Sequence, residues 1–534
     1  MDVSVSYNQE KTAYPGIFGW IFSTDHKRIG VLYLLSIATF FIVGASIGVV
    51  MRLEMLTPGQ TIVQPRTYNA LFTVHGVIMI FLIVLPGVPS IFGNFFLPIQ
   101  LGAKDVAFPK LNILSWWLYM TGALIAVAGL FVGGGAPDTG WTFYAPYTLK
   151  SATNIVMPLF GAFILGISSI ITGLNFITTI HRMRCPGMTW NKMPLFAWGL
   201  YATAWIQVLA NPIVGITLLL VIFEKVFDIG VFDPSKGGDP LLYQHLFWIY
   251  SHPAVYIMIL PGMGIISEIL PTFSKKNIFG YKAIAYSSML IAIIGSFVWA
   301  HHMFTTGMSD IARIVFSFLT FLVAIPTGVK IFNWLATLYG GSIEVKTPLL
   351  YALVFIFQFC IGGFTGMILG TLSTDLHVHD TYYVVGHFHY TMFGGLGFAL
   401  LGGLYYWFPK MFGKMYSEKH SRIALGTLFV GFNTLYFHML IMGWLGMPRR
   451  YYDYLGYFQT LHVTSTIGSW ILFVGIFYMM GNLIHAGLKG EKAQANPWGG
   501  TTLEWKISSP PPTENFEEIP EVVYGPYERK GGQE

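Results

Sequence analysis

Residues 244–261 read QHLFWIYSHPAVYIMILP, an apolar run long enough to form most of a membrane-spanning helix. His252 and Tyr256 lie inside this run, four residues apart, so on a helix they share one face. An ionisable side chain inside a bilayer is costly unless it is paired, and it therefore indicates a functional site by default. The rest of the sequence is interpreted outward from these two residues.

The composition is that of a membrane protein with many spans. Of the 534 residues, 54% are hydrophobic and only 10% are charged, which excludes an ordinary soluble domain. The net charge of +5 is small and gives no indication of nucleic-acid binding. Cys185 and Cys360 are the only cysteines and form no C-x-x-C, which argues against disulfides, a zinc ribbon, an iron–sulfur site and covalently attached haem.

Twelve apolar stretches predict an all-α integral membrane protein, a twelve-helix transmembrane bundle forming one domain. They lie near residues 29–51, 69–100, 111–132, 155–180, 196–222, 245–270, 281–301, 311–338, 348–370, 384–408, 423–446 and 462–486. We expect an inner N-terminal segment (1–28), the helical domain (29–488) and a polar C-terminal tail (489–534). Three consecutive prolines at 510–512 exclude a helix interior, so we expect the tail to be extended and exposed.

The distribution of Lys and Arg predicts the orientation of the bundle. With the N-terminus on the inner side, the inner segments hold about twice as many Lys and Arg as the outer ones. The chain is therefore expected to be multi-pass with a cytoplasmic N-terminus.

Other histidines lie in or beside further apolar runs, and together they predict buried metal sites. His301 and His302 end one run, His387 and His389 open another, and His75 lies in a fourth. Packing against backbone carbonyls explains one such histidine well, but it does not explain six. Imidazole suits copper and iron, so a buried metal site is the first hypothesis.

Helix geometry limits how these histidines can be combined. His387 and His389 point about 200° apart on a helix and are expected to bind two different metals. His301 and His302 are adjacent, so they need a helix end or a distortion to converge. With His252 they would supply three imidazoles to one metal and leave a position open for a substrate. His75 could pair with His387 or with His389 as the second axial ligand of a haem, and spacing leaves both pairings open.

Four motifs, HPAVY, HHMFTTGM, AIPTGVK and HDTYYVVGHFHY, resemble in their order subunit I of the haem–copper terminal oxidases of the cytochrome c oxidase type. The resemblance runs from about Thr24 to the last helix. It implies four-electron reduction of O2 to water, coupled to proton translocation, with electrons from cytochrome c through subunit II. A quinol oxidase of the same fold is the alternative. Tyr256 and Lys330 argue against a nitric oxide reductase, and a transporter with structural histidines would contain no haem.

The resemblance also implies a role for each histidine. His75 and His389 look like the axial ligands of the low-spin haem a, and His387 like the single ligand of the high-spin haem a3. His252, His301 and His302 look like the ligands of copper B. Tyr256 looks like the tyrosine that the family joins covalently to a copper-ligand histidine.

Further matches suggest residues around the cofactors. Arg449 and Arg450 resemble the pair that holds the haem propionates, and Arg52 resembles the arginine near the formyl group of the low-spin haem. Glu54 matches a cation site, for which calcium is expected. His379 and Asp380 look like outer magnesium ligands, completed by a carboxylate from subunit II.

Two proton paths are implied, and one of them departs from the family. Thr327 and Lys330 look like the path that leads to Tyr256. Asp105, Asn94 and Asn112 resemble the mouth and neck of a second path, which in most relatives ends at a glutamate in H-P-E-V-Y. Here that position is Ala254, and Tyr250 and Ser251 precede His252. We expect Tyr250 and Ser251, with water, to form the terminal proton relay, because one helical turn separates Tyr250 from Ala254.

The expected partners are subunit II with a dinuclear copper centre, subunit III, cytochrome c as electron donor and membrane lipid. The Ala254 departure resembles a bacterial pattern, so the bacterial plasma (inner) membrane is the favoured location. The mitochondrial inner membrane is the alternative.

Overall fold

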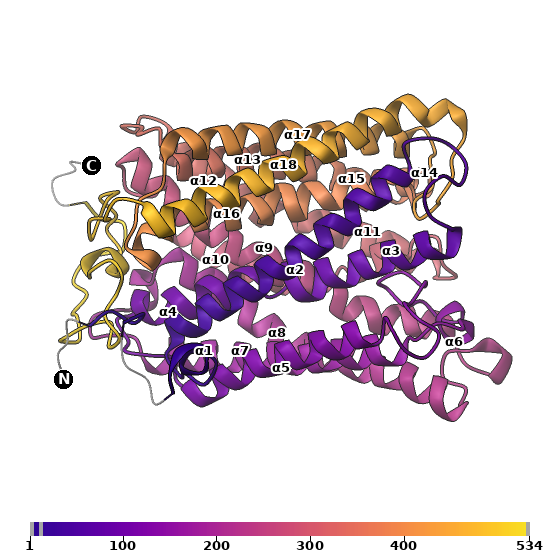
Figure 1. Ribbon diagram of the computed structural model, residues 1–534, viewed down its shortest axis with the longest axis horizontal. Helices are drawn as coiled ribbons and strands as arrows, with labels where there is room; N and C mark the ends of the chain where they lie inside the picture. The colour runs from indigo at the N-terminus through magenta and orange to yellow at the C-terminus, as the bar shows by residue number, and fades with distance from the viewer. Residues whose placement is uncertain (1–4, 10–13, 530–534) are drawn as a thin grey trace.

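The computed structural model describes residues 5–9 and 14–529. Parts of the predicted N-terminal segment (1–4 and 10–13) and of the predicted tail (530–534) lie outside the described residues. Within the described residues all regular structure is helical, and only isolated β-bridges occur besides. The long helices run side by side along the molecule, with loops at both ends (Figure 1). The predicted all-α bundle is confirmed.

Eleven segments of the described chain are long and apolar enough to cross a membrane, and α10 (Tyr281–Gly295) is a shorter twelfth. The helices that form the eleven are α2 (His26–Glu54), α3 (Pro65–Val77) with α4 (Asn94–Leu101), α5 (Pro109–Ala128), α7 (Val156–Arg182), α8 (Leu195–Phe227), α9 (Pro240–Ser274), α11 (Asp310–Leu322) with α12 (Ala324–Leu338), α13 (Thr347–Gly370), α15 (Tyr382–Thr391) with α16 (Phe398–Phe412), α17 (Glu418–Trp444) and α18 (Gln459–Lys489). The short helix α1 (Gly16–Ile21) precedes them, and α6 (Tyr147–Lys150) and α14 (Leu372–Val378) lie between them along the chain.

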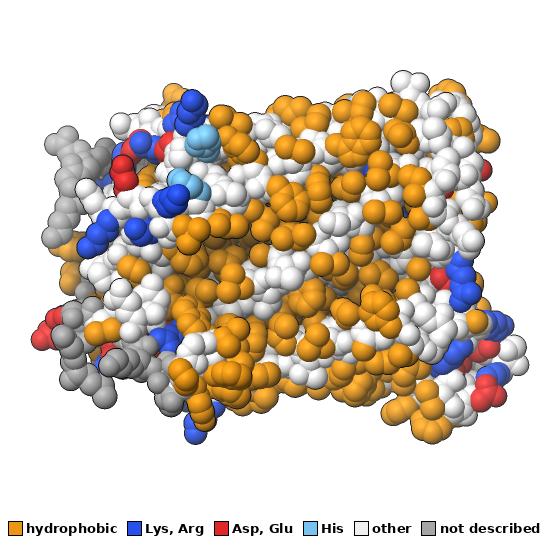
Figure 2. All heavy atoms as spheres, in the orientation of Figure 1, with side chains coloured by type: hydrophobic (Ala, Val, Ile, Leu, Met, Phe, Trp, Pro, Cys, Tyr) orange, Lys and Arg blue, Asp and Glu red, His pale blue; other side chains and the backbone are white. Residues whose placement is uncertain are grey.

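Hydrophobic side chains cover the middle of the face seen in Figure 2, while Lys, Arg, Asp and Glu gather at the two ends. Large apolar side chains of the long helices are more than half exposed, among them Leu209, Phe318, Phe332 and Phe364. Such exposure would be unfavourable in water and is favourable in lipid. The outer surface therefore matches a bundle that spans a bilayer.

The predicted seventh helix is shorter than expected, and its end shapes the site. The sequence suggested a helix over residues 281–301, but α10 ends at Gly295 and a 3₁₀ turn, η5 (Trp299–Met303), follows. A Cβ at Gly295 would lie 2.2 Å from Cε2 of Tyr256, so the chain passes against the tyrosine ring. Glycine is needed at this contact, and the turn after it carries His301 and His302.

Two spans contain π-helical turns, which occur mostly at functional sites. The turns η1 (Ile78–Val84) and η2 (Pro89–Gly93) lie between α3 and α4, shortly after His75. The turn η6 (Met392–Gly397) follows α15, shortly after His387 and His389. The helical register therefore changes shortly after His75 and again shortly after the pair His387 and His389.

The C-terminal tail is extended, as predicted, but the prediction that it is exposed was wrong. Trp498, Glu504 and Trp505 are buried, and the tail covers one end of the bundle (yellow in Figure 1), called the inner end below. Lys410 of α16 donates to the carbonyls of Ala495, Ile507 and Ser508 at 2.8, 2.6 and 3.1 Å. The tail binds the bundle through apolar rings and backbone carbonyls, which its polar composition did not indicate.

Asn515 is a second anchor of the tail. Its Nδ2 donates to the carbonyls of Ala103 and Lys104, both at 2.9 Å, and its Oδ1 accepts from Lys27 Nζ at 2.9 Å. The residue is fully buried and has φ +60°, a conformation that asparagine tolerates better than most residues. One side chain thus connects the tail, the start of α2 and the loop that leads to Asp105.

We predict that Asn515→Ala lowers the free energy of unfolding by about 2 kcal/mol, because two buried carbonyls and one ammonium group each lose a partner. Thermal unfolding of the purified protein in detergent measures this loss. The control is Glu514→Gln, which breaks the neighbouring Lys104–Glu514 pair at 3.2 Å; both side chains there are 57% exposed. That change should cost less than about 1 kcal/mol. Equal losses in the two variants would contradict the assignment of Asn515 as an anchor.

Candidate metal centre

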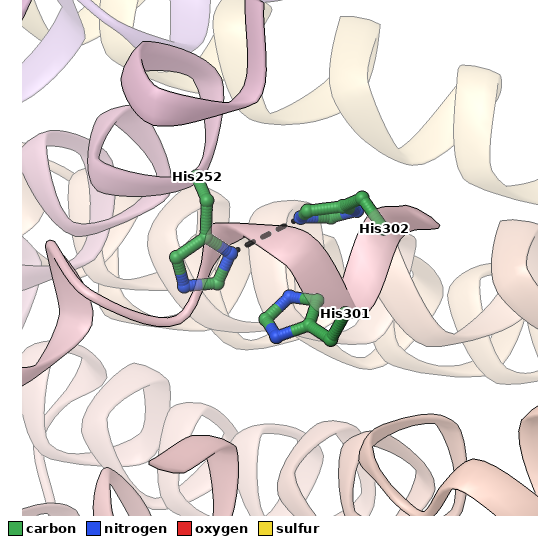
Figure 3. Close-up of side chains that lie close together, drawn as sticks. All are labelled: His252, His301 and His302. Carbon is green, nitrogen blue, oxygen red and sulfur yellow. Dashed lines mark hydrogen bonds between the residues drawn. The ribbon is translucent and has the colours of Figure 1, made fainter. Parts of the chain in front are cut away.

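Three imidazoles from two distant segments converge at one point. His252 comes from α9, and His301 and His302 come from η5. Nδ1 of His252 lies 3.1 Å from Nε2 of His302, and one ligand nitrogen from each of the three rings lies within 4.8 Å of the others. Figure 3 shows the three rings turned toward a common centre. This is a donor set for one transition-metal ion.

Contacts outside the cluster fix the orientation of two of these rings. The ring of Trp248 stacks on His302 at a centroid distance of 3.7 Å and an angle of 8°. Nδ1 of His301 lies 2.9 Å from Oγ1 of Thr320 in α11, which leaves Nε2 as the nitrogen for the metal. Sequence reasoning missed both partners, because nothing in their local sequence marks them.

Tyr256 lies beside the cluster, one helical turn after His252. Its hydroxyl oxygen is 2.8 Å from Nε2 of His252. The two nitrogens of His252 therefore face different groups, with Nδ1 toward the cluster and Nε2 toward the phenol. A proton on the phenol lies next to a candidate metal ligand.

A cavity of about 1660 Å³ extends through the bundle and is bordered by all six candidate histidines and by Tyr256. Glycines border this cavity beside two of the histidines. A Cβ at Gly366 would lie 2.8 Å from Cε1 of His387, and one at Gly48 would lie 3.3 Å from Cε1 of His75. A side chain at either position would therefore crowd the imidazole and reduce the space beside it.

The remaining three histidines are oriented as metal ligands. Nδ1 of His75 lies 2.8 Å from the carbonyl of Gly44, Nδ1 of His389 lies 2.8 Å from that of Val385, and Nδ1 of His387 lies 3.0 Å from that of Gly362. A carbonyl accepts only from a protonated nitrogen, so Nδ1 carries the proton and Nε2 is left with its lone pair. A hydrogen bond of this kind is what usually orients a metal-bound imidazole.

His387 and His389 face opposite flanks of α15, as predicted from their spacing. His387 contacts α13 through Gly362 and Thr365, whereas His389 stacks on Tyr436 of α17 at 4.1 Å. His75, His387 and His389 all border the large cavity, so the pairing of His75 that spacing left open stays a prediction.

Three arginines border the cavity. Arg449 and Arg450 are adjacent, and burial, together with the charge of Arg449, lowers the pKa of Arg450 to about 10. The one carboxylate that pairs with Arg449 is Asp380, at 3.7 Å, and it is 70% exposed. Arg52 donates through Nη2 to the carbonyl of His462 at 2.9 Å, while its Nε is buried without a partner in the described chain. This end of the cavity therefore suits an anionic or carbonyl-bearing group.

The two residues expected to bind magnesium lie at the outer end. His379 Nε2 and Asp380 Oδ2 are 4.0 Å apart, and Nδ1 of His379 lies 2.9 Å from Oδ2 of the buried Asp375. Asp375 thus orients the histidine, a role that the sequence alone did not reveal. The pair presents one nitrogen and one carboxylate oxygen, which fits a hard cation only if other ligands complete it.

The surroundings of Glu54 do not fit a cation. Its carboxylate accepts from the backbone N–H groups of Thr61, Ile62 and Val63 at 3.0, 2.7 and 2.9 Å. These contacts hold the loop after α2 and use the oxygen lone pairs that calcium would need. The calcium prediction is left without support in this structure.

The candidate proton-path residues lie at several depths. Lys330 is buried and donates to Ser288 Oγ at 2.7 Å, and Thr327, one turn earlier, borders the large cavity. Asp105 lies in the loop between α4 and α5, where burial raises its pKa to about 7. Asn94 and Asn112 are fully buried, and each has an amide oxygen without a partner among the described residues.

Comparisons with known proteins agree with one another. The family model described as "Cytochrome C and Quinol oxidase polypeptide I" matches residues 28–471. Cytochrome c oxidase subunit 1 of Synechocystis sp. is 46% identical over 508 residues, which cover 95% of this chain and 92% of that protein. The same subunit of Thermostichus vulcanus is 44% identical over 530 residues, covering 99% and 96%, and that of Cereibacter sphaeroides is 40% identical over 536 residues, covering 94% and 95%.

Among solved structures, a cryo-EM structure of a heme–copper terminal oxidase dimer superposes with a TM-score of 0.77. It is 22% identical, and the match covers 88% of this chain and 85% of that one. At this identity the similarity shows the fold alone.

We predict that His302→Ala removes one transition-metal ion per chain, because two imidazoles hold such an ion much less tightly than three. Metal analysis of the purified protein measures the loss. The control is His420→Ala, which removes an exposed imidazole bonded only to Tyr478 within the described chain and should leave the metal content unchanged. An unchanged metal content in His302→Ala would exclude the three-histidine site.

Proposed function

The chain belongs to the family of cytochrome c and quinol oxidase polypeptide I, and on this premise we propose how its residues act in a proton-translocating cytochrome c oxidase. The catalytic subunit of this terminal respiratory oxidase reduces O2 to water. One observation carries the proposal: the His252, His301 and His302 cluster, Tyr256 and His387 border the same buried cavity.

The donor set and the glycine-lined cavity fit two haems and one copper. His75 and His389 would hold the low-spin haem a, His387 the high-spin haem a3, and His252, His301 and His302 copper B. When bound, these groups supply the electrons and the open coordination positions that O2 reduction needs. Arg449 and Arg450 would bind the haem propionates as charge-assisted pairs, and Arg52 would contact the formyl group.

Tyr256 is placed to supply a proton at the site of O2 reduction. Its hydroxyl is within hydrogen-bond distance of Nε2 of His252, so no mobile carrier is needed for the last step. The same proximity supports the covalent join between this tyrosine and His252 that the family resemblance implies. Lys330 and Thr327 would resupply the phenol, because Lys330 bonds Ser288 deep inside the bundle and Thr327 borders the cavity that contains Tyr256.

A second path would start at Asp105. A carboxyl with a pKa of about 7 exchanges protons readily at neutral pH, and Asn94 and Asn112 have amide oxygens without a partner among the described residues. The bundle also contains a second cavity of about 40 Å³. Tyr250 borders both this cavity and the large one, and in the described chain no other polar side chain does so.

That shared position supports the relay proposed for this chain, in which Ala254 replaces the usual glutamate. A phenol can accept a proton on one side and release its own on the other, so a single side chain can connect the two cavities. Ser251 is the neighbouring hydroxyl, and its Oγ is buried without a partner in the described residues. Tyr250 and Ser251, with water, therefore take the place of the missing carboxyl.

The proposed partners are subunit II with its dinuclear copper centre, subunit III and cytochrome c. A carboxylate of subunit II would complete the magnesium site at His379 and Asp380. The relatives named above are cytochrome c oxidase subunits, which favours cytochrome c over quinol as the donor. We place the protein in a bacterial plasma membrane with its N-terminus inside, since the relatives are bacterial.

We predict that the purified complex contains two haems per chain and consumes O2 with reduced cytochrome c. Metal analysis, an optical spectrum and an oxygen electrode test this, with a quinol as the competing donor. Consumption supported by quinol alone would identify the quinol oxidase alternative. A complex without haem would overturn the oxidase assignment.

We predict that Tyr250→Phe lowers turnover by about tenfold or more and reduces the protons released per electron, because the ring is retained while the exchangeable proton is lost. Turnover and proton release are measured in the same reconstituted vesicles. The matched control is Tyr243→Phe on the same helix; Tyr243 borders neither cavity, and its hydroxyl donates to the carbonyl of Thr142 at 2.7 Å. Wild-type turnover and pumping in Tyr250→Phe would refute the relay.

A further inference from the structure

The small cavity behind Tyr250 is bordered by polar groups from five other parts of the chain. They are Tyr33 of α2, Ser90 of η2, Tyr119 of α5, Ser168, Ser169 and Thr172 of α7, and Gln207 and Asn211 of α8. Its volume of about 40 Å³ exceeds the roughly 10–15 Å³ that one water molecule requires on this measure. Polar lining and sufficient room are the two conditions for a water site inside a protein.

Gln207 and Asn211 are unusual in their helix. They lie one turn apart on α8, between long apolar stretches, and both are buried. Nδ2 of Asn211 donates to Ser169 Oγ at 3.0 Å and to the carbonyl of Gln207 at 2.7 Å. Oδ1 of Asn211 and Oε1 of Gln207 have no hydrogen-bond partner in the part of the chain that the structure describes.

The two oxygens argue against a purely structural role for the amides. The hydrogen bond from Asn211 of α8 to Ser169 of α7 uses only Nδ2, so it does not account for either amide oxygen. A buried acceptor left without a partner costs about 1–3 kcal/mol, and leucine would pack at both positions without this cost. A ligand that donates hydrogen bonds removes the cost, and water is the donor that fits a cavity of this size.

We propose that Gln207 and Asn211 bind a small water cluster that carries protons from the Ser168–Ser169 side of the cavity to Tyr250. This inference rests on the proposed function, since it assigns the segment just before the tyrosine relay. A proton that joins the cluster at one end releases another to the Tyr250 hydroxyl, whose own proton passes into the large cavity. Reorientation of the waters then restores the hydrogen-bond arrangement that preceded the proton transfer. The amides are positioning residues, because they orient water and exchange no proton.

The test uses the assembled oxidase with Gln207→Met and Asn211→Leu, singly and together, since these side chains keep the approximate volume and remove the acceptors. We expect the double variant to retain its haem content and optical spectrum, to lose about tenfold in turnover, and to show a larger solvent isotope effect. Loss of water O–H bands from its infrared difference spectrum should accompany the slower turnover. If the amides served only in packing, neither the solvent isotope effect nor the infrared water bands would change.

Two further variants keep the result unambiguous. Thr217→Val removes a buried hydroxyl on the same helix. This hydroxyl donates to the backbone carbonyl of Ile213 and does not border the cavity, so the variant should behave as wild type. Asn211→Ser, which keeps a hydroxyl at the cavity, should recover most of the turnover that Asn211→Leu loses. If the double variant does not assemble, the two single variants and this recovery decide the outcome.

Normal turnover, isotope effect and infrared bands in the amide variants would overturn the water site. If Tyr250→Phe is slow in the same preparations, the relay stands and only the water site fails. If Tyr250→Phe is normal as well, the failure lies with the proposed relay.

Discussion

The site depends on how an imidazole is accommodated in a bundle that is surrounded by lipid. Lipid cannot satisfy the ring nitrogens, so the protein must provide a partner or leave one nitrogen for a metal. At His75, His387 and His389 a backbone carbonyl accepts from Nδ1 and Nε2 remains. The backbone that forms the helices thus also sets the tautomer of three candidate ligands.

The histidine cluster follows from the same constraint but needs a break in the helix. Adjacent residues on a regular helix diverge by about 100°, so His301 and His302 could not approach one ion from there. The end of α10 at Gly295 and the 3₁₀ turn after it bring both rings toward His252. The glycine at this helix end also admits the ring of Tyr256, so the candidate metal ligands and the candidate proton donor depend on one contact.

Sequence reasoning succeeded where a residue type carries its own physical signature in lipid. The spans, the six histidines and the buried Lys330 could be predicted because apolar length and a charge within it are local properties of the chain. The orienting role of Thr320 and the buried tail could not be predicted, because each depends on which distant segment lies beside it. Asp375 lies one helical turn before His379, and Glu54 binds a loop 7–9 residues later, but nothing in the sequence marks these local contacts. Trp498 and Trp505 were the available signal for the tail, since tryptophan is seldom left exposed.

At the end of the bundle that the tail covers, groups that hold the fold together lie beside Asp105, the candidate entry of a proton path. Asn515 binds the carbonyls of residues 103 and 104, directly before Asp105, and Lys27 binds Asn515. The charges of Lys27 and Asp25 also act on Asp105, although burial has the largest effect on its pKa. A carboxyl that takes up protons near neutral pH must be partly withdrawn from water yet not neutralised by a close cation. The tail provides this by supplying a neutral amide beside the loop, while the ammonium of Lys27 is held by Asp25 at 3.1 Å and by Asn515. A tail of polar composition therefore helps to set the surroundings of Asp105 through the contacts of its buried Asn515.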